Sequence, residues 1–194
     1  GDLVLDVCAA PGGKATALVT EGAIVIAADM RPSRLTLLSS NRDRLDISPS
    51  DLHIVGADGT APPFRPQSFD RVLLDAPCSG LGALRRRPDA RWRIAQKDID
   101  ELVQVQRQLF TEAIALVRPG GELVYSVCTI TAAETSEFDE WATQNFPDLV
   151  ARPLDRSPWT SLGRGALLLP QDAGTDGMYI LRLGVPTHEK EVHQ

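Results

Sequence analysis

The chain has 194 residues, of which 43% are hydrophobic, and a formal net charge of −6 at pH 7, which is typical of one globular domain with a sizeable buried core. Its longest apolar runs have only the length of a strand, so the composition excludes a membrane-spanning helix and gives no reason to expect a membrane partner. Three cysteines in a chain too large to need disulfide staples favour a reducing compartment, and we predict a cytoplasmic protein.

Apolar runs of strand length alternate with helix-like stretches along the chain. Strands are expected at 3–7, 23–28, 52–55, 71–74, 122–127 and 178–183, and helices at 32–44 and 98–117. The sequence "RPGG" at 118–121 is expected to end the long helix, and Thr131, ahead of Glu134, to cap a further helix that reaches Phe146. Strands that are apolar throughout and alternate with helices predict a doubly wound α/β fold with a mostly parallel sheet. We expect one domain over 1–185 and a polar, disordered tail over 186–194.

A glycine-rich turn, "CAAPGGK" at 8–14, follows the first strand. It does not fit a phosphate-binding P-loop, because Gly13-Lys14 is followed by alanine and the first glycine of that motif is missing. It also lacks the Gly-x-Gly-x-x-Gly spacing of a dinucleotide-binding turn. The turn therefore predicts a different ligand.

Acidic residues follow successive strands, where the ligands of such a sheet bind. Asp29, after the second strand, has the place of a carboxylate that accepts both hydroxyls of a ribose, and Asp58, after the third, is placed to accept from an adenine amino group. Neither role involves a phosphate, which favours S-adenosylmethionine, a nucleoside cofactor without pyrophosphate. We expect its amino-acid end to lie against the backbone amides of residues 9–13. Each acid alone is more typical of a cap or turn than of a ligand contact, but four such positions on consecutive strands favour a functional site. Lys14 either reaches the cofactor carboxylate or is solvated.

Two of the three cysteines follow strands that are expected to be neighbours. Cys78 follows the fourth strand and Cys128 the fifth, so both thiols should open on the crevice that holds the cofactor. A thiolate is the nucleophile that adds to an electron-poor pyrimidine ring, and Asp75 in "DAPCSG" is placed to bond a ring nitrogen. For Cys8 alone, we expect an inert, buried small side chain.

Four blocks, "LDVCAAPGGKAT", "DRVLLDAPCSGLGALRRRPDARW", "PGGELVYSVCTITAAE" and "LLPQDAGTDGMYILRL", resemble the successive motifs of the bacterial Sun (Fmu) family of ribosomal-RNA cytosine-5 methyltransferases. The resemblance runs from Gly1 to about Leu183. It implies a Rossmann-like, S-adenosylmethionine-dependent methyltransferase fold, a covalent bond from Cys128 to carbon 6 of cytosine, and help from Cys78 in releasing the product. The cofactor pocket that it implies consists of Cys8, Ala9, Ala10, Pro11, Gly12, Gly13, Lys14, Asp29, Asp58 and Asp75. Where relatives commonly have Thr-Cys, this chain has Val127-Cys128-Thr129, and because such enzymes carry an RNA-binding region upstream, we expect the chain to be a fragment.

An arginine-rich segment, expected to be a loop, follows the Cys78 motif. It holds Arg85, Arg86, Arg87, Arg91 and Arg93, which we interpret as contacts to RNA phosphates, with Trp92 either stacking on a base or packed in the core. The expected partner is RNA, in the first place ribosomal RNA, and no metal site or obligate protein partner is predicted. Two alternatives stay open: a DNA cytosine-5 methyltransferase that attacks through Cys78, and a non-catalytic RNA-binding factor that retains the cofactor pocket.

Overall fold

A computed structural model describes residues 1–187, and within them the strands form one sheet of nine in the order β3-β2-β1-β4-β5-β9-β8-β7, with β6 beside β9. The strands are β1 (Leu3–Asp6), β2 (Ile24–Asp29), β3 (Leu52–Gly56), β4 (Phe69–Asp75), β5 (Val117–Val127), β6 (Val150–Ala151), β7 (Thr160–Leu162), β8 (Gly165–Leu168) and β9 (Met178–Gly184). The helices are α1 (Gly13–Thr20), α2 (Pro32–Arg44), α3 (Ala90–Arg93), α4 (Gln96–Leu116), α5 (Ser136–Asn145) and α6 (Pro170–Ala173), with short 3-10 turns η1 (Leu81–Ala83) and η2 (Ala132–Glu134).

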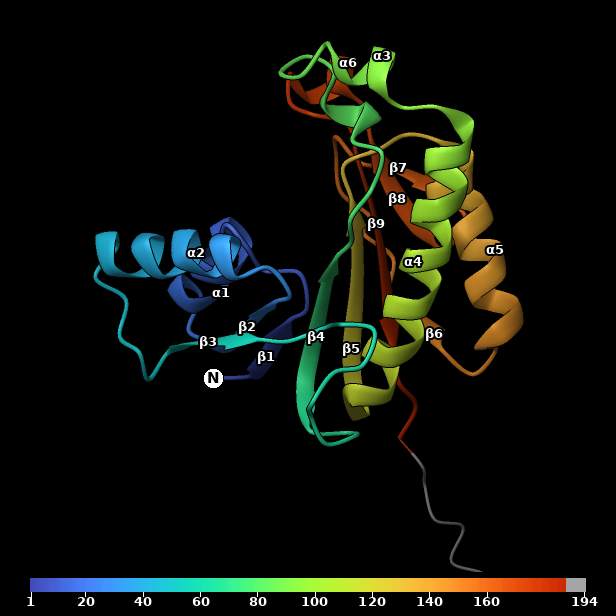
Figure 1. The fold of residues 1–194 in the computed structure, drawn as a ribbon. Coiled ribbons are helices and arrows are strands. Elements are labelled where there is room, and N and C mark those ends of the chain that lie inside the picture. Colours follow the sequence, from blue (N-terminus) through green and yellow to red (C-terminus); the bar gives the residue numbers. More distant parts are fainter. Residues whose placement is uncertain (188–194) are drawn as a thin grey trace, which may run out of the picture.

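The five strands from β3 to β5 are parallel, which confirms the doubly wound α/β fold (Figure 1). From β1 the chain moves outward through α1, β2 and α2 to β3, and it then returns to β4 and moves the other way through α4 to β5. Since such crossovers are right-handed, α1 and α2 cover one face of the sheet and α4 covers the other. The direction in which the chain adds strands to the sheet therefore reverses between β1 and β4. Ligands of this fold bind at such a switch point, beyond the carboxyl ends of the strands.

The carboxyl-terminal part of the chain adds an antiparallel edge to the sheet. Strand β9 pairs with β5 and with β8, and a tight turn at Gly163 joins β7 to β8. Gly163 has a φ of 60°, a conformation that glycine adopts without strain. The strands β6, β7 and β8 were not predicted, because runs of two to four residues are too short to show an alternating pattern.

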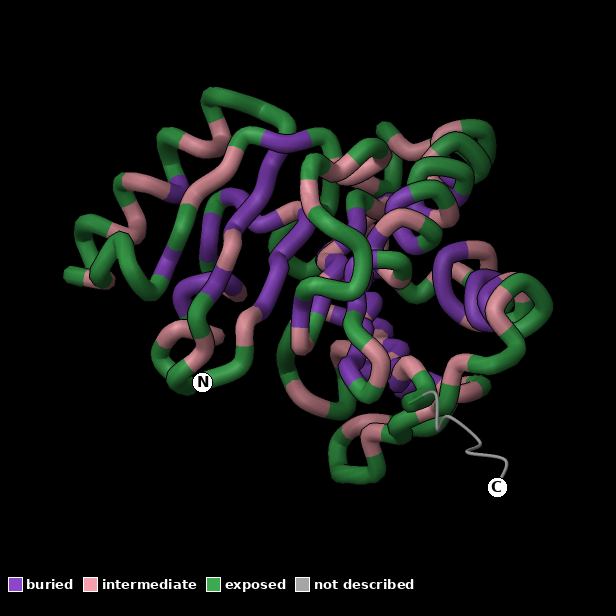
Figure 2. Tube along the Cα trace, turned by 90° about the horizontal axis from the view of Figure 1, so that it is seen from below, coloured by how far each residue is buried: buried purple, intermediate pink, exposed green. Residues whose placement is uncertain are grey.

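The core follows the sheet and the inner faces of the helices, as the buried stretches of Figure 2 show. Aromatic rings fill the space where α4 and α5 meet β5. The rings of Tyr125 and Phe138 stack with centroids 4.1 Å apart, and Phe110 lies edge-on to Phe138 at 5.5 Å. All three side chains are fully buried, so this cluster anchors β5 and the loop that follows it.

Three local predictions need correction. Helix α4 ends at Leu116, next to the "RPGG" sequence as expected, but that sequence lies inside β5 rather than ahead of it; Gly120 is left-handed there, and a bulge interrupts the pairing with β4. Part of the arginine-rich segment is helical in α3 rather than a loop. Thr131 does not cap a continuous helix: η2 and α5 are separate, and the Thr131 hydroxyl donates to the side chain of Glu134.

The predicted tail lies almost wholly outside the described residues, which end at residue 187. Within the described part of the chain, no helix combines the length and the apolar character needed to cross a membrane.

Candidate active site

The glycine-rich turn between β1 and α1 is held against both neighbouring strands. The Val7 amide donates to the Leu73 carbonyl at 3.0 Å, and the Ala9 amide donates to the Ala28 carbonyl at 2.9 Å. Gly12 has a φ of 107°, which residues with a side chain rarely adopt, and an added Cβ there would approach Leu38 to 3.2 Å. The turn therefore presents a fixed backbone at the switch point of the sheet.

Asp29 and the glycine turn are brought together, as predicted. Its buried carboxylate accepts from the Ala10 amide at 3.3 Å and from the Arg31 amide at 3.0 Å, and Arg34 forms an ion pair with it at 3.5 Å. Arg34 also donates to the Ala10 carbonyl. Asp29 thus supports the turn structurally, which the sequence did not indicate.

Asp58 forms side-chain hydrogen bonds with none of these groups among the described residues. Its exposed carboxylate accepts from the Thr60 amide at 2.9 Å and from the Thr60 hydroxyl at 2.7 Å. These two donors keep the pKa of Asp58 below its ordinary value. The contacts fit the turn-forming alternative, and a contact between Asp58 and an adenine remains a prediction.

Asp6, the last residue of β1, was missed as a site residue. It is 1% exposed, and neither side-chain oxygen has a hydrogen-bond partner among the described residues. Burial, followed by the charge of Asp75, raises its pKa to about 7. An unpartnered acid at the base of the turn fits a ligand with a cationic end, which the amino-acid part of S-adenosylmethionine has. Burial and the charge of Asp6 also raise the pKa of Cys8 to about 12, so that thiol stays protonated.

The two remaining cysteines lie side by side. The sulfurs of Cys78 and Cys128 are 3.3 Å apart, within hydrogen-bond distance, and both side chains are half-buried. The hydrogen bond from Cys78 lowers the pKa of Cys128 to about 7, whereas the same contact and burial raise the pKa of Cys78. Of the two thiols, Cys128 is the one whose ionisation this contact favours.

Lys14 and Asp75 form an ion pair beside these thiols. The Lys14 ammonium lies 2.5 Å from an Asp75 carboxylate oxygen, and both groups act on the charge of Cys128, Asp75 raising and Lys14 lowering its pKa. Neither sequence interpretation of Lys14 anticipated this pairing. It brings the glycine turn, the acid after β4 and the thiol of Cys128 into one site.

A buried carboxylate behind the thiols was also missed. Glu134 is fully buried and accepts hydrogen bonds from Ser79, which follows Cys78, and from Thr131, which lies on the Cys128 loop. From the sequence, Glu134 fitted a helix-capping pattern. No sequence signal distinguished that role from this one.

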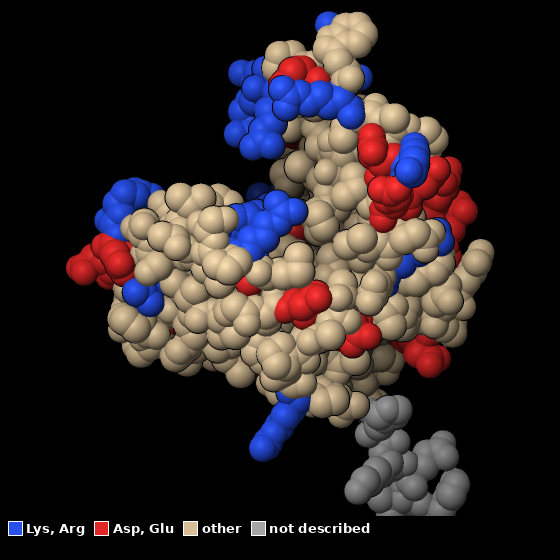
Figure 3. Space-filling model, in the orientation of Figure 1, with Lys and Arg blue, Asp and Glu red and all other residues tan. Residues whose placement is uncertain are grey.

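The chain just before the arginine-rich segment is anchored to the loop that carries Cys128. The Gly82 amide donates to the Cys128 carbonyl at 3.0 Å. An added Cβ on Gly82 would lie 2.9 Å from that carbonyl, so glycine is required for the approach. Figure 3 shows basic side chains over α3 and α6, above a hollow that separates them from the α1 and α2 half of the molecule. The arginine-rich segment, which includes α3, therefore lies at the rim of this hollow.

These arginines are not all free for a ligand. Arg86 forms an ion pair with Asp176, Arg93 lies 3.2 Å from Asp89, and Arg85 donates to the Gly174 carbonyl. A shallow pocket of about 500 Å³ lies between Arg85, Arg86 and the residues around Asp176. Trp92 is 78% exposed with the Arg91 guanidinium 4.6 Å from its ring, so its packing in the core is excluded.

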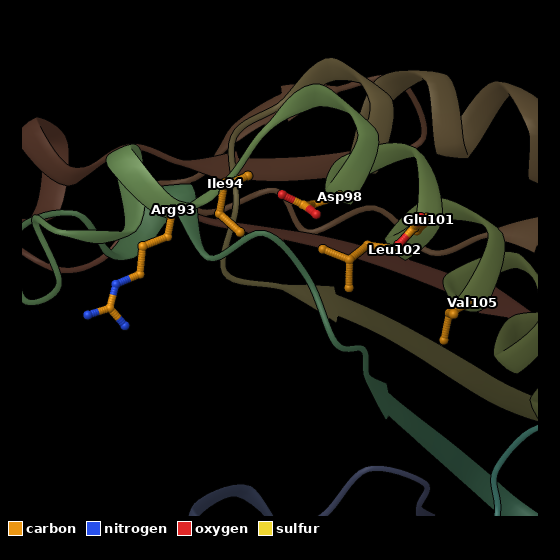
Figure 4. Close-up of a pocket in the computed structure, with 6 residues that line it drawn as sticks. All are labelled: Arg93, Ile94, Asp98, Glu101, Leu102 and Val105. Atoms are coloured by element: carbon orange, nitrogen blue, oxygen red, sulfur yellow. The ribbon is translucent and has the colours of Figure 1, made fainter.

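A second shallow groove, of about 510 Å³, follows the end of α3 and the first turns of α4 (Figure 4). Its apolar wall consists of Ile94, Leu102 and Val105, and Arg93, Asp98 and Glu101 add charge. Apart from Arg93, it contains no residue predicted for the site.

A mostly parallel sheet with this switch-point turn, an acid after β2 that supports the turn, and two apposed thiols defines the class of Rossmann-like, S-adenosylmethionine-dependent methyltransferases. Within that class, the chain belongs to the family described as 16S rRNA methyltransferase RsmB/F, whose model matches residues 1–184. This confirms the resemblance to the bacterial Sun family.

Individual relatives agree with that membership. Human tRNA (cytosine(72)-C(5))-methyltransferase NSUN6 is 40% identical over 169 residues, covering 79% of this chain and 35% of its own. The ribosomal RNA small subunit methyltransferase B of Vibrio cholerae is 35% identical over 183 residues, covering 92% of this chain and 40% of its own. The structure of NSun6 from Pyrococcus horikoshii with SFG superposes with a TM-score of 0.81 at 29% identity, over 94% of this chain and 47% of that one. The chain thus spans less than half the length of these relatives.

Proposed function

We propose that this protein is an S-adenosylmethionine-dependent RNA cytosine-5 methyltransferase that acts on ribosomal RNA through a covalent bond between Cys128 and cytosine carbon 6. The observation that carries the proposal is the contact of 3.3 Å between the sulfurs of Cys78 and Cys128 at the ends of two adjacent parallel strands. The names of the related enzymes, which modify cytosine in transfer RNA or act on ribosomal RNA, support the substrate class.

The cofactor is held at the switch point. In the proposal, the backbone of the turn from Cys8 to Gly13 and the carboxylate of Asp6 receive its amino-acid end, Asp29 receives the ribose, and Asp58 receives the adenine. The SFG bound to the Pyrococcus horikoshii relative is an analogue of S-adenosylmethionine, which supports this choice of ligand. When bound, S-adenosylmethionine supplies the methyl group that carbon 5 of cytosine accepts.

The thiolate of Cys128 begins the reaction. Carbon 5 of cytosine is too weak a nucleophile by itself, so Cys128 adds to carbon 6, and the electron pair of the 5,6 double bond moves toward carbon 5 and ring nitrogen 3. As charge develops on nitrogen 3, this atom takes up a proton from solvent, and the Asp75 carboxylate, oriented by Lys14, accepts the hydrogen bond of the new N–H, with an effect of about 3 to 4 kcal/mol if it equals one oxyanion-hole donor. A pKa of Cys128 of about 7 leaves a large share of this thiol ionised at neutral pH.

Product release reverses the first bond. Water takes the proton from carbon 5, the electron pair of that C–H bond restores the 5,6 double bond, and the bond from sulfur to carbon 6 breaks with its electron pair on the sulfur of Cys128. Nitrogen 3 then returns its proton to solvent. Cys78 returns its hydrogen bond to the departing thiolate, which stabilises Cys128 as a leaving group. The target base has to leave its stack to reach the thiols, so unpaired or strained RNA is the expected substrate form.

The rim of the site grips the RNA. We infer that Arg85, Arg86, Arg87, Arg91 and Arg93 contact the phosphates that flank the target, and that exposed Trp92 stacks on a neighbouring base. Arg87 is exposed and forms no ion pair in the described part of the chain, so it is the first of these arginines to test. A cytoplasmic location is part of the proposal.

Trapping on RNA that contains 5-fluorocytosine tests the assignment of the nucleophile. Fluorine at carbon 5 replaces the proton that has to leave, so a covalent complex should accumulate with the wild-type protein and be seen as a shifted band on a denaturing gel. C128S should abolish this complex and C78S should retain it. Loss with C78S alone would support attack by Cys78, and failure of every protein to form the complex while binding RNA would support a non-catalytic factor.

A further inference from the structure

Glu134 is a carboxylate enclosed entirely by uncharged donors. Its side chain is 0% exposed. One oxygen accepts from the Ser79 amide and from Gln106, both at 2.9 Å, and the other accepts from the Ser79 hydroxyl at 2.5 Å and from the Thr131 hydroxyl at 2.8 Å. None of these donors carries a charge, so the negative charge is solvated by hydrogen bonds but is not neutralised.

The same carboxylate connects the two loops that carry the thiols. Ser79 directly follows Cys78, and Thr131 lies three residues after Cys128. A hydrogen bond of 2.8 Å between the hydroxyls of Ser79 and Thr129 closes a second link. The spacing of the sulfurs is therefore fixed by contacts behind them and not by the thiols themselves.

Gln106 ties this cluster to the rest of the fold. Its amide group also donates to the Pro77 carbonyl at 2.9 Å, and its carbonyl accepts from the Tyr125 hydroxyl at 3.1 Å. The Tyr125 hydroxyl reaches the backbone carbonyl of Glu134 as well, at 3.0 Å. Helix α4 and strand β5 thus hold Glu134 in place from two sides.

Charge is distributed unequally around the thiol pair. Asp75 and Lys14 act on the charge of Cys128, and Arg86 interacts with that thiol as well. Glu134 acts on the charge of Cys78, and Tyr125 interacts with both of these groups. Lys14 and Asp75 pair with each other, whereas Glu134 has only neutral partners. The carboxylate of Glu134 accepts from both the amide and the hydroxyl of Ser79, so this unpaired charge is held against the residue that directly follows Cys78.

We propose that Glu134 is a positioning residue that decides which thiol of the pair keeps its proton, so that Cys78 remains the S–H donor and Cys128 becomes the thiolate. Its four hydrogen bonds hold the Cys78 loop against the Cys128 loop, and its charge disfavours a second negative charge on Cys78, whose neighbour Ser79 donates to it twice. The catalytic consequence rests on the proposed function, because it explains why only one of two adjacent thiols attacks. The charge of Glu134 is among the causes that raise the pKa of Cys78, which supports the same direction.

Alkylation of the thiols by iodoacetamide tests the proposal without RNA or cofactor. The protein is labelled briefly across pH 6 to 9, and the label on each cysteine is quantified by peptide mass spectrometry. In the wild-type protein, Cys128 should be labelled at least about tenfold faster than Cys78 at pH 7, since one pKa unit changes the thiolate fraction about tenfold. E134Q should lower this ratio at least about threefold through new label on Cys78, and E134D should restore it.

S79A separates the charge from the hydrogen-bonded frame. This variant removes the Ser79 hydroxyl but leaves Glu134 ionised, so the labelling ratio should stay near the wild-type value. An equal fall in S79A and E134Q would show that only packing matters and would overturn the proposal, as would an unchanged ratio in a folded E134Q.

The wild-type measurement needs no substitution, so it decides even if E134Q does not fold. Label on Cys78 that appears as fast as label on Cys128 contradicts the proposal directly. The result is independent of the trapping experiment, in which the proposed function fails by the absence of an RNA complex.

Discussion

The Lys14 ammonium lies 2.5 Å from the carboxylate of Asp75 and so joins the first turn of α1 to the end of β4. The two residues are 61 positions apart in the sequence. They meet between β1 and β4, the two parallel strands at which the order of the strands along the sheet reverses. The pair places a cation next to the thiol that we propose as nucleophile. Lys14 therefore contacts the acid beside the thiols and also belongs to the turn that we propose as the cofactor site.

Replacement of Lys14 by methionine should make Cys128 less reactive. Lys14 is one of the groups that lower the pKa of Cys128, so its loss should move that pKa up from about 7 toward the ordinary value of 9.0. At pH 7 the rate of iodoacetamide labelling of Cys128 should then fall several-fold, and the midpoint of the rate against pH should move upward.

Lys97 provides a matched control for this measurement. It is exposed on α4 and pairs with Glu101, one turn away, at 3.5 Å. K97M removes the same charge from the protein and should leave the labelling profile of Cys128 unchanged. An equal shift in both variants would mean that net charge, and not the position of Lys14, sets the reactivity.

Replacement of Asp6 by asparagine should make the protein more stable at alkaline pH in the absence of ligand. The pKa of Asp6 is raised from 3.8 to about 7 in the folded protein, so folding favours the protonated acid. The contribution of Asp6 to the free energy of unfolding is fully present below about pH 4, the pKa in the unfolded chain. It is lost as the pH rises through 7, by an amount on the order of 4 kcal/mol for a shift of this size. D6N resembles the protonated acid at every pH.

Urea unfolding at pH 4.5 and at pH 8 measures this difference. At pH 8, the free energy of unfolding of the wild-type protein should be lower than that of D6N. At pH 4.5, the difference in free energy of unfolding between the two proteins should be smaller. A gap that does not depend on pH would show that Asp6 has an ordinary pKa in the folded protein.

The parts of the site that the sequence predicted correctly follow from the order of the strands. Cys78 and Cys128 each follow a strand, and since β4 and β5 are parallel neighbours, the two thiols had to meet at one edge of the sheet. The same rule brought Asp29 to the glycine turn. Topology therefore carried these contacts, and no knowledge of side-chain conformations was needed.

The parts that the sequence did not predict depend on three-dimensional burial. Glu134 fits a capping pattern in the sequence, but its side chain points into the protein, where Ser79 and Gln106 donate to it. Asp6 looks like any acid at the end of a strand until its two oxygens are seen without partners. Partners that are distant in sequence decide both cases, and local patterns contain no information about them.

Replacement of Asp29 by alanine should weaken cofactor binding and lower stability moderately. The ribose loses its proposed acceptor, while the Ala10 and Arg31 amides lose theirs, which costs about 1 to 3 kcal/mol for a buried donor left unsatisfied. Calorimetry with S-adenosylmethionine should show an affinity at least about tenfold lower, with the far-UV spectrum of a folded protein.

Asp43, exposed on α2 and paired only with its neighbour Arg42, gives the matched control. D43A should bind the cofactor as the wild-type protein does. If D29A binds normally as well, the proposed ribose contact is wrong, and Asp29 serves only to hold the turn.

Replacement of Trp92 by alanine should weaken RNA binding without affecting stability. The side chain is 78% exposed and lies beside Arg91 in the basic rim of the site, so its removal leaves no cavity. Stacking on one base contributes about 1 to 3 kcal/mol, so the Kd for a short single-stranded RNA should rise by about five- to one-hundred-fold in a filter-binding measurement. V150A, which shortens another exposed apolar side chain, on β6, should change neither the Kd nor the melting temperature.

An unchanged Kd in W92A would restrict the RNA contact to the arginines. In that case R87A should lose more affinity for the RNA than W92A does, and its Kd should depend less on the salt concentration.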